Sequence, residues 1–552
     1  MARHGGQVLV DQLKELGVRR VFSVPGESFL AALDGLHRSG IENVVCRHEG
    51  GAAMMAEAAG KMTGRPGVVF VTRGPGATNA SAGIHIARQD STPLVMFVGQ
   101  IARGHRDREA FQELNYRAVF GTMAKWVAEV DQVDRLPEYV VRAFRVAQSG
   151  RPGPVVLALP EDMLSSLCDA QVLPLPELAP PAPDKAAVGD VMDRLANAKR
   201  PLVVVGGSVW SARAADDLEQ FARKNDVPVA ATFRRQDYLD NSSEHYVGDL
   251  SVGMNPALAD RLRDADFLLL IGTRFGDIPT NGYELVTPEA EGKVVVHVHP
   301  DPDLPGTWLR TDLAICAGAP DMLRALRRAD AVGDIRWADW RAQARADYEE
   351  WQQPVETPGA VKMEAVVRWL SDTLPEDAIV TNGAGNYAAF LHRYFRFKQH
   401  GTQLAPTSGS MGYGFPGAVA ASLQHPDRMV VCLAGDGCFQ MTLNEMSTAM
   451  QHGARPIVIV ANNGRYGTIR MHQERTYPAR VSGTDLANPD YATLARAYGG
   501  HGEVVENGDE FPAAFARARA AGVLSVIELR LDSEALSTGL TLSATRELGR
   551  AG

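Results

Sequence analysis

The stretch Met429–Arg465 constrains the fold more than any other part of the chain. A short apolar run, Met429–Ala434, leads into the turn Gly435–Asp436–Gly437, and a second apolar run covers Ile457–Ala461. Between the two runs, apolar residues recur at three- and four-residue steps over Phe439–Gln451, which predicts a helix. Two strands joined by a helix form a crossover unit whose strands lie parallel. The stretch therefore predicts part of a parallel α/β sheet.

Polar residues follow both apolar runs. Asp436 comes after the first run, and Asn463 comes after the second. Open α/β sheets bind ligands at the carboxyl ends of their strands, so the two side chains can converge on one point. Both offer oxygen, which suits Mg²⁺, an ion that often completes its shell with phosphate. The glycines beside Asp436 would let backbone N–H groups approach a phosphate at the start of the helix.

Composition limits the classes of protein that remain. A chain of 552 residues is too long for one core and predicts three or four domains. With 45% hydrophobic and 22% charged residues it is globular, and a net charge of −10 argues against nucleic acid or an anionic membrane as a partner. No apolar run reaches the ~20 residues of a membrane span, and the amino-terminal residues do not resemble a signal peptide. The five cysteines are scattered and form no CxxC pair, so we expect a cytoplasmic protein with reduced thiols.

The rest of the chain repeats the strand–turn–helix pattern, which predicts doubly wound parallel sheets. The repeats fall into the segments 1–175, 184–332 and 359–535, followed by a helical or flexible tail over 536–552. Leu173–Pro183 is rich in proline and predicts an extended linker. Further strands are predicted over Arg20–Val24, Glu42–Arg47, Gly67–Thr72, Leu94–Val98, Leu202–Val205, Phe267–Ile271, Lys293–Val298 and Ala378–Thr381.

Several separate motifs resemble one family. The Gly-Asp-Gly turn, twenty-four intervening residues (438–461) and Asn-Asn resemble the metal–diphosphate motif of thiamine-diphosphate (ThDP) enzymes. RHEGGAAMMAEA, TRGPGATNA, DSTPLVMFVGQ and EAFQEL follow in the order found in the acetohydroxyacid (acetolactate) synthase-like family. The resemblance implies three α/β domains, each a doubly wound parallel sheet: pyrimidine-binding (1–175), central (184–332, binding FAD or vestigial) and diphosphate-binding (359–535). It also implies a homodimer or homotetramer whose active sites are shared between subunits.

The resemblance assigns roles to particular residues. Asp436, Asn463 and the backbone carbonyl of Arg465 would hold Mg²⁺. Glu49 matches the glutamate that hydrogen-bonds the aminopyrimidine ring and activates the cofactor, although by position alone it could be an ordinary carboxylate in the first turn of a helix. The residues expected to bind the cofactor are Pro25, Gly26, Gly74, Asn79, Asn386, Tyr387, Ser410, Met411, Gly435, Asp436, Gly437, Cys438, Asn463, Tyr466 and Gly467.

Other assignments from the resemblance have plain structural alternatives. Phe111 and Gln112 match residues on the substrate side of the site, but Phe111 could equally anchor a loop. Met411 matches the residue that props the cofactor into its bent shape, and it could also be a core methionine. In the central segment, Gly206–Gly207–Ser208 stands where the family has a glycine triplet, while Thr273–Arg274–Phe275 fits the family pattern. FAD and a vestigial domain therefore both stay open.

The implied activity is ThDP- and Mg²⁺-dependent decarboxylation of a pyruvate-like 2-oxo acid, followed by ligation to a second carbonyl compound. This would be a transferase or lyase of the acetolactate synthase type. A decarboxylase or C–C lyase without ligation is the first alternative. His472 stands where the synthases usually carry a tryptophan that shapes the acceptor pocket, which leaves the second substrate open. A catalytically silent ThDP-binding subunit is a more remote alternative.

Overall fold

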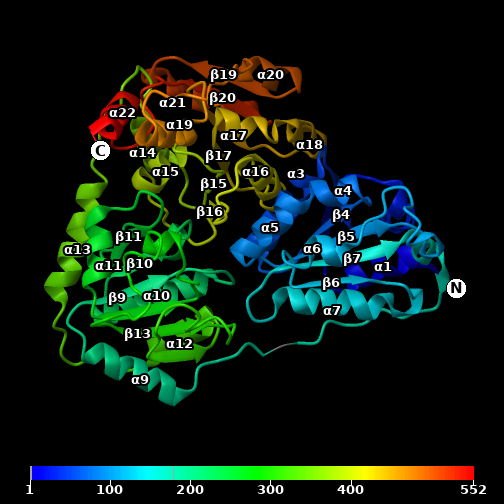
Figure 1. Cartoon of the computed structure of the whole chain (residues 1–552), viewed down its shortest axis with the longest axis horizontal. Helices are drawn as coiled ribbons and strands as arrows, with labels where there is room; N and C mark the ends of the chain where they lie inside the picture. The colour runs from blue at the N-terminus through cyan, green and yellow to red at the C-terminus, as the bar shows by residue number, and fades with distance from the viewer. Residues whose placement is uncertain (1–2, 178, 552) are drawn as a thin grey trace.

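Three lobes, each built on a six-stranded sheet, make up the chain in the computed structural model, which describes residues 3–177 and 179–551 (Figure 1). The strand orders are β3-β2-β4-β5-β7-β6, β11-β10-β9-β12-β13-β14 and β16-β15-β17-β18-β20-β19. Neighbouring strands pair in parallel in all three sheets. The predicted fold class is confirmed. The domain boundaries stay predictions, and Met1, Ala2, Leu178 of the predicted linker and Gly552 lie outside the described residues.

The first lobe buries one helix on almost every side. Helix α3 (Glu49–Thr63) is rich in alanine, glycine and methionine, and nearly all of its first twelve residues are buried. A helix without a polar face packs between other elements rather than on a surface. The strands are β2 (Arg20–Ser23), β3 (Glu42–Val45), β4 (Gly67–Val71), β5 (Leu94–Gln100), β6 (Trp126–Glu129) and β7 (Pro154–Pro160). The other helices are α1 (Gly5–Glu15), α2 (Leu30–Leu36), α4 (Pro75–Asn79), α5 (Ser81–Asp90), α6 (Tyr116–Phe120), α7 (Leu136–Gln148) and α8 (Glu161–Ser165).

The central lobe has its own core, formed by the faces of its strands and the helices on both sides. Its inner strands are almost continuously apolar, as expected for a parallel sheet covered on both faces. The strands are β9 (Pro201–Val205), β10 (Val229–Thr232), β11 (Tyr246–Leu250), β12 (Phe267–Ile271), β13 (Val294–His299) and β14 (Leu313–Cys316). The helices are α9 (Lys185–Ala196), α10 (Ala212–Asn225), α11 (Pro256–Asp264), α12 (Ala319–Arg328) and α13 (Ala338–Trp351).

The third lobe contains the crossover stretch from which the sequence analysis began. Its strands are β15 (Ile379–Asn382), β16 (Gln403–Leu404), β17 (Val430–Gly435), β18 (Ile457–Asn462), β19 (His501–Val505) and β20 (Ser525–Arg530). Its helices are α14 (Met363–Thr373), α15 (Tyr387–Tyr394), α16 (Gly414–Gln424), α17 (Asp436–Gln440), α18 (Met446–His452), α19 (Gly467–Thr476), α20 (Tyr491–Ala497), α21 (Phe511–Ala521) and α22 (Leu542–Ala551).

The prediction of a single helix over Phe439–Gln451 is wrong. The segment is divided into α17, a 3₁₀ turn η6 (Leu443–Glu445) and α18. Thr442 causes the break, because its backbone leaves the helical region at φ −140° and its hydroxyl donates to the carbonyl oxygen of Gly412 at 2.7 Å. A tertiary hydrogen bond has therefore replaced local helix continuity.

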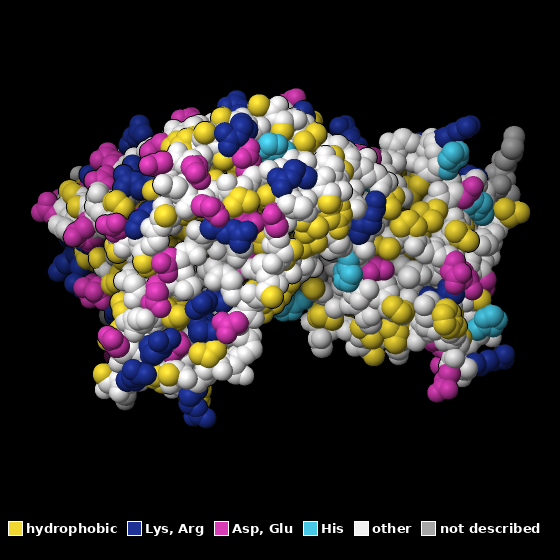
Figure 2. Space-filling view, turned by 90° about the horizontal axis from the view of Figure 1, so that it is seen from above, with side chains coloured by type: hydrophobic (Ala, Val, Ile, Leu, Met, Phe, Trp, Pro, Cys, Tyr) yellow, Lys and Arg dark blue, Asp and Glu magenta, His cyan; other side chains and the backbone are white. Residues whose placement is uncertain are grey.

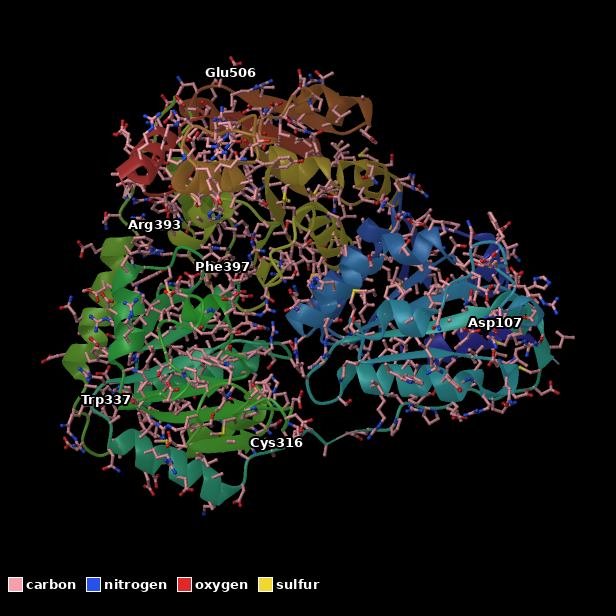
Figure 3. The ribbon with its side chains drawn as sticks, viewed as in Figure 1. Asp107, Cys316, Trp337, Arg393, Phe397 and Glu506 are labelled. Atoms are coloured by element: carbon pink, nitrogen blue, oxygen red, sulfur yellow. The ribbon has the colours of Figure 1, made fainter. Side chains whose placement is uncertain are left out.

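The third lobe packs against both of the other lobes. Helix α3 of the first lobe lies against α16 of the third, and the two lobes share one apolar core that includes Met55 and Val419. The central and third lobes meet at Phe397, whose backbone exchanges hydrogen bonds with Asn241 at 2.8 and 2.9 Å (Figure 3).

On the face seen in Figure 2, acidic and basic side chains are interspersed. None of the helices that the structure describes is long and apolar enough to cross a membrane.

Candidate active site

Asp436 lies at the point where the crossover unit was predicted to form a site. Strands β17 and β18 are parallel neighbours, and Asp436 follows β17 directly as the first residue of α17. One carboxylate oxygen accepts the backbone N–H of Gly437 at 2.9 Å. The other accepts the N–H of Gly464 at 3.0 Å and the side-chain amide of Asn488 at 2.7 Å. The buried carboxylate is thus fixed between the turns that follow the two strands.

The chemistry around Asp436 fits a divalent cation. Burial raises the pKa of Asp436, because a poorly solvated carboxylate is costly to ionise. Three accepted hydrogen bonds occupy most, but not all, of the roughly four lone-pair sites of a carboxylate. Asn463 lies in the turn after β18, with its amide oxygen 3.3 Å from the backbone nitrogen of Arg465. One carboxylate with an amide oxygen and a backbone carbonyl is an oxygen donor set of the kind Mg²⁺ takes.

A cavity of about 250 Å³ opens beside Asp436. Its lining is mostly apolar, and the Nε atom of Arg465 is buried without a hydrogen-bond partner in the part of the chain that the structure describes. Gly437 must be glycine here, since a Cβ would lie 2.6 Å from the Tyr466 ring. The predicted cofactor residues that line the cavity are Asn386, Tyr387, Met411, Gly435, Asp436, Gly437, Cys438, Asn463, Tyr466 and Gly467, with the predicted metal ligand Arg465 beside them. Ser410 is not one of the lining residues; its hydroxyl donates to the carbonyl oxygen of Met411 at 3.0 Å.

Glu49 occupies the corresponding edge of the first sheet. It is the first residue of α3, it is buried, and its carboxylate accepts the side-chain amide of Asn79 at 3.0 Å. A Cβ on Gly76 would lie 3.1 Å from the other carboxylate oxygen, so the loop after β4 closes over Glu49. Pro25 and Gly26 lie in the turn after β2, at the same edge of the sheet.

Phe111 and Gln112 lie in an exposed loop of the first lobe. The side chain of Phe111 is 73% exposed, and Gln112 adopts a left-handed backbone at φ 65°. This backbone packs against Gly74, where a Cβ would lie 2.8 Å from the Cβ of Gln112. Figure 3 shows Asp107, in the same loop, far from the third lobe. Phe111 therefore faces solvent within one chain.

One chain does not bring the two halves of the predicted site together. The cavity beside Asp436 is lined by residues 363–536 alone, and no first-lobe residue belongs to it. Glu49 and Asn79 are hydrogen-bonded in the first lobe, and Gln112 packs against Gly74 of the loop that closes over Glu49. The structure thus contains two partial sites, each at the carboxyl end of a parallel sheet.

Some residues of the site were not predicted from the sequence. Asn488 donates both to Asp436 and, at 2.9 Å, to the amide oxygen of Asn462. Thr468 accepts the backbone N–H of Asn386 at 3.0 Å and donates to its side chain at 2.9 Å. No local pattern marks Asn488, which reaches the site from the loop before α20. The Tyr466–Gly467–Thr468 run was a partial signal for Thr468, since its first two residues were predicted.

A second cavity, of about 570 Å³, lies between the three lobes. Arg234 and Arg274 line it, and three of its buried polar atoms have no partner among the residues described: Nε of Arg234, Nε2 of His392 and Oγ of Ser408. This lining fits the phosphates of a nucleotide such as FAD. Strand β10, however, ends at Thr232 without the carboxylate that usually holds a dinucleotide ribose. The lining therefore fits FAD only in part.

Comparison with known proteins defines the class. Three family models match the chain, described as the N-terminal thiamine pyrophosphate (TPP) binding domain, the central domain and the C-terminal TPP binding domain of thiamine pyrophosphate enzymes. They cover residues 3–119, 188–326 and 383–529, one on each lobe. With a buried oxygen-donor site on the third lobe and a buried glutamate on the first, the protein is a thiamine-diphosphate-dependent enzyme.

Individual relatives narrow the class. The chain is 31% identical to the acetolactate synthase isozyme 2 large subunit of Escherichia coli (strain K12), covering 93% of this chain and 92% of that protein. It is 33% identical to the acetolactate synthase large subunit of Parasynechococcus marenigrum, over 90% of this chain and 82% of that one. The chain belongs to the acetolactate synthase-like family of these enzymes, which confirms the resemblance seen in the sequence.

Proposed function

We propose that this protein is a Mg²⁺-dependent carboligase that decarboxylates a pyruvate-like 2-oxo acid and joins the remaining fragment to a second carbonyl compound. The observation that carries the proposal is the buried carboxylate of Asp436, held between two turns beside Asn463 and an apolar cavity. The relatives named acetolactate synthase support an acetolactate-type product.

The third lobe holds the cofactor in this proposal. Asp436, Asn463 and the carbonyl of Arg465 would bind Mg²⁺, and the amino end of α17 would face the diphosphate. When bound, ThDP would supply a nucleophilic thiazolium carbon for the ketone and a cationic ring that takes up the electron pair released as CO₂ leaves. Met411 and the other apolar lining residues exclude water and disfavour charged ground states.

Glu49 would exchange a proton with the aminopyrimidine ring. Asn79 fixes the orientation of its carboxylate through the 3.0 Å hydrogen bond, and burial keeps bulk water from competing for the same oxygens. A positioned carboxylate of this kind is suited to general acid–base work. Gln112 and Phe111 flank the second carbonyl compound.

The active site is completed by a second copy of the chain, in a homodimer or homotetramer. The cavity lined only by residues 363–536 and the exposed Phe111 loop support this arrangement. In the assembly, Glu49 and Phe111 of one subunit face the Asp436 cavity of another.

The products of the reaction test the proposal. The purified protein is incubated with ThDP, Mg²⁺ and pyruvate, and CO₂, acetolactate and acetaldehyde are measured. Acetolactate is the expected product. Acetaldehyde without acetolactate would instead identify a decarboxylase, and no CO₂ from any of a panel of 2-oxo acids would leave a silent subunit or a substrate outside the panel.

FAD enters the proposal only as a ligand of the interlobe cavity, and none of the steps above uses it. Arg234 and Arg274 would contact its phosphates. The absorption spectrum of the purified protein, before and after addition of FAD and gel filtration, shows whether flavin binds.

A further inference from the structure

Glu445 is a fully buried carboxylate that reaches from the third lobe into the first. It ends the turn η6 and is 0% exposed. Its carboxylate accepts the backbone N–H of His48 at 2.9 Å and that of Arg47 at 3.1 Å. These two residues form the turn between β3 and α3, and Glu49 is the next residue. The contact therefore fixes the backbone from which the Glu49 side chain extends.

The contact is built from both lobes. The Thr448 hydroxyl donates to Glu445 at 2.5 Å and orients its carboxylate. On the first lobe, Gly51 leaves room for the approach, because a Cβ there would lie 2.5 Å from a carboxylate oxygen of Glu445. Burial raises the pKa of Glu445, while its hydrogen bonds to Thr448, Arg47 and His48 oppose that rise. The donors are thus arranged to hold a carboxylate at a place where charge is otherwise costly.

Helix α18 extends the same contact along the edge of the first sheet. Strand β3 is an edge strand, and the imidazole Nε2 of His452 accepts the backbone N–H of Val45 at 2.9 Å. Burial lowers the pKa of His452, which favours the neutral ring that can accept this hydrogen bond. Glu445 and His452 therefore hold the strand end and the helix start on either side of Arg47.

We infer that Glu445 is a positioning residue for the proton exchange carried out by Glu49. The inference rests on the proposed role of Glu49. A carboxylate near a helix amino terminus is common and by itself only stabilises the helix. Here the carboxylate comes from another lobe, and the segment that carries it begins at Asp436, so one short segment holds the metal site at its start and the Glu49 turn at its end.

The test compares four variants at the cofactor itself. Glu445→Gln keeps the side-chain size but replaces one acceptor oxygen with an amide that cannot accept. Because a misplacement of about 1 Å can cost about 100-fold in rate, we expect hydrogen–deuterium exchange at C2 of bound ThDP, followed by NMR, to slow by about 10- to 100-fold. ThDP affinity in saturating Mg²⁺ should stay within about twofold, because Glu445 does not line the Asp436 cavity.

Glu364→Gln is the matched control. Glu364 is also buried in the third lobe and also accepts a backbone N–H and a threonine hydroxyl, both from Thr357 at 2.8 Å. Exchange at C2 should be normal in this variant. Equal slowing in Glu364→Gln and Glu445→Gln would assign the effect to general loosening of the lobe and overturn the inference.

Two further variants complete the test. Thr448→Val removes the hydroxyl that orients Glu445 and should slow exchange in the same direction but less, which gives a readout if Glu445→Gln does not fold. Glu49→Gln separates the two hypotheses. If Glu49→Gln slows exchange and neither Glu445→Gln nor Thr448→Val does, the positioning role is refuted while the proposed function stands. If hydrogen–deuterium exchange at C2 of ThDP is normal in Glu49→Gln, the proposed function itself fails.

Discussion

Asp436 combines two opposite demands at the scale of a single residue. Its carboxylate is buried, which disfavours the ionised form in the metal-free protein, yet the proposed metal site needs that form. Asp436→Asn removes the charge at nearly constant size. We expect the Mg²⁺-dependent affinity for ThDP to fall about 100-fold, or about 2.7 kcal/mol, measured by calorimetric titration with and without Mg²⁺. The apo variant should unfold at the same or a slightly higher temperature, since a costly buried charge is gone. An unchanged Mg²⁺ dependence would contradict the metal assignment.

Phe111 gives the opposite case, a large apolar side chain that one chain leaves in solvent. Phe111→Ala should leave the unfolding temperature of the protein unchanged, because little packing is lost. If Phe111 flanks the acceptor, the yield of ligated product per CO₂ should drop roughly tenfold, the usual scale for an apolar contact in a specificity pocket. The ratio of acetolactate to CO₂ measures this. Leu30→Ala, at another exposed large apolar residue of the first lobe (62%), is the control and should keep the ratio.

Site residues could be predicted from the sequence where they directly follow a predicted strand. Asp436 and Asn463 each follow an apolar run directly, so the parallel crossover alone brings them to one edge. Asn488 and Glu445 were not predictable in this way. Asn488 reaches Asp436 through a long loop, and Glu445 contacts a turn nearly four hundred residues earlier in the chain. Their roles depend on tertiary packing, which no local pattern encodes.

At the scale of secondary-structure elements, the carboxy-terminal helix packs against a helix that borders the site. Helix α22 packs on α19, which begins at Gly467 beside the Asp436 cavity. The Arg546 guanidinium donates to both carboxylate oxygens of Glu474 at 2.8 Å. These hydrogen bonds lower the pKa of the buried Glu474 to about 2. Residues 542–551 of the predicted tail therefore form a helix held against α19, which begins beside the cavity.

The Glu474–Arg546 pair predicts a pH dependence of stability. The folded pKa lies below the unfolded value of about 4.3, so the contribution is complete above that value and is lost as pH falls toward 2. We expect Arg546→Met to lower the free energy of unfolding by about 2 kcal/mol at pH 7, with the difference from the unmodified protein shrinking between about pH 4.5 and 2. Urea denaturation at several pH values measures both.

A matched ion pair controls for charge alone. Arg135 and Glu138 also form a two-bond pair, but both side chains are about half exposed. Arg135→Met should change the free energy of unfolding by less than about 1 kcal/mol. An equal loss in the two variants would mean that the Glu474–Arg546 pair contributes no more to the free energy of unfolding than an exposed ion pair does.

Helices and strands could be predicted from the sequence where nearly all of their residues are buried. Strand β12 has the bounds the sequence predicts, because a run of apolar residues between polar turns leaves few alternatives. The predicted helix over Phe439–Gln451 failed because its periodic apolar positions are divided among α17, η6 and α18, while the Thr442 hydroxyl donates to the carbonyl oxygen of Gly412 in a different loop.

For the whole molecule, repeated strand–helix units predicted three parallel sheets, and the structure contains them. The packing of the lobes could not be predicted in the same way. The first and third lobes share one apolar core through α3 and α16, although each sequence segment reads as an independent domain. At the edge of this shared core, the turn before Glu49 contacts Glu445 of its own third lobe, while no first-lobe residue lines the cavity of Asp436.

Active sites shared between subunits predict complementation between two inactive variants. In a dimer of one Glu49→Gln chain and one Asp436→Asn chain, one site combines both changes and the other combines none. With random exchange, half of the dimers are mixed and half of their sites are intact, so about a quarter of the unmodified activity should return. The two variants are unfolded together, refolded and assayed for CO₂ release, with each variant refolded alone as the control. Sites formed within single chains would give no recovery, and that result would refute the shared-site assembly.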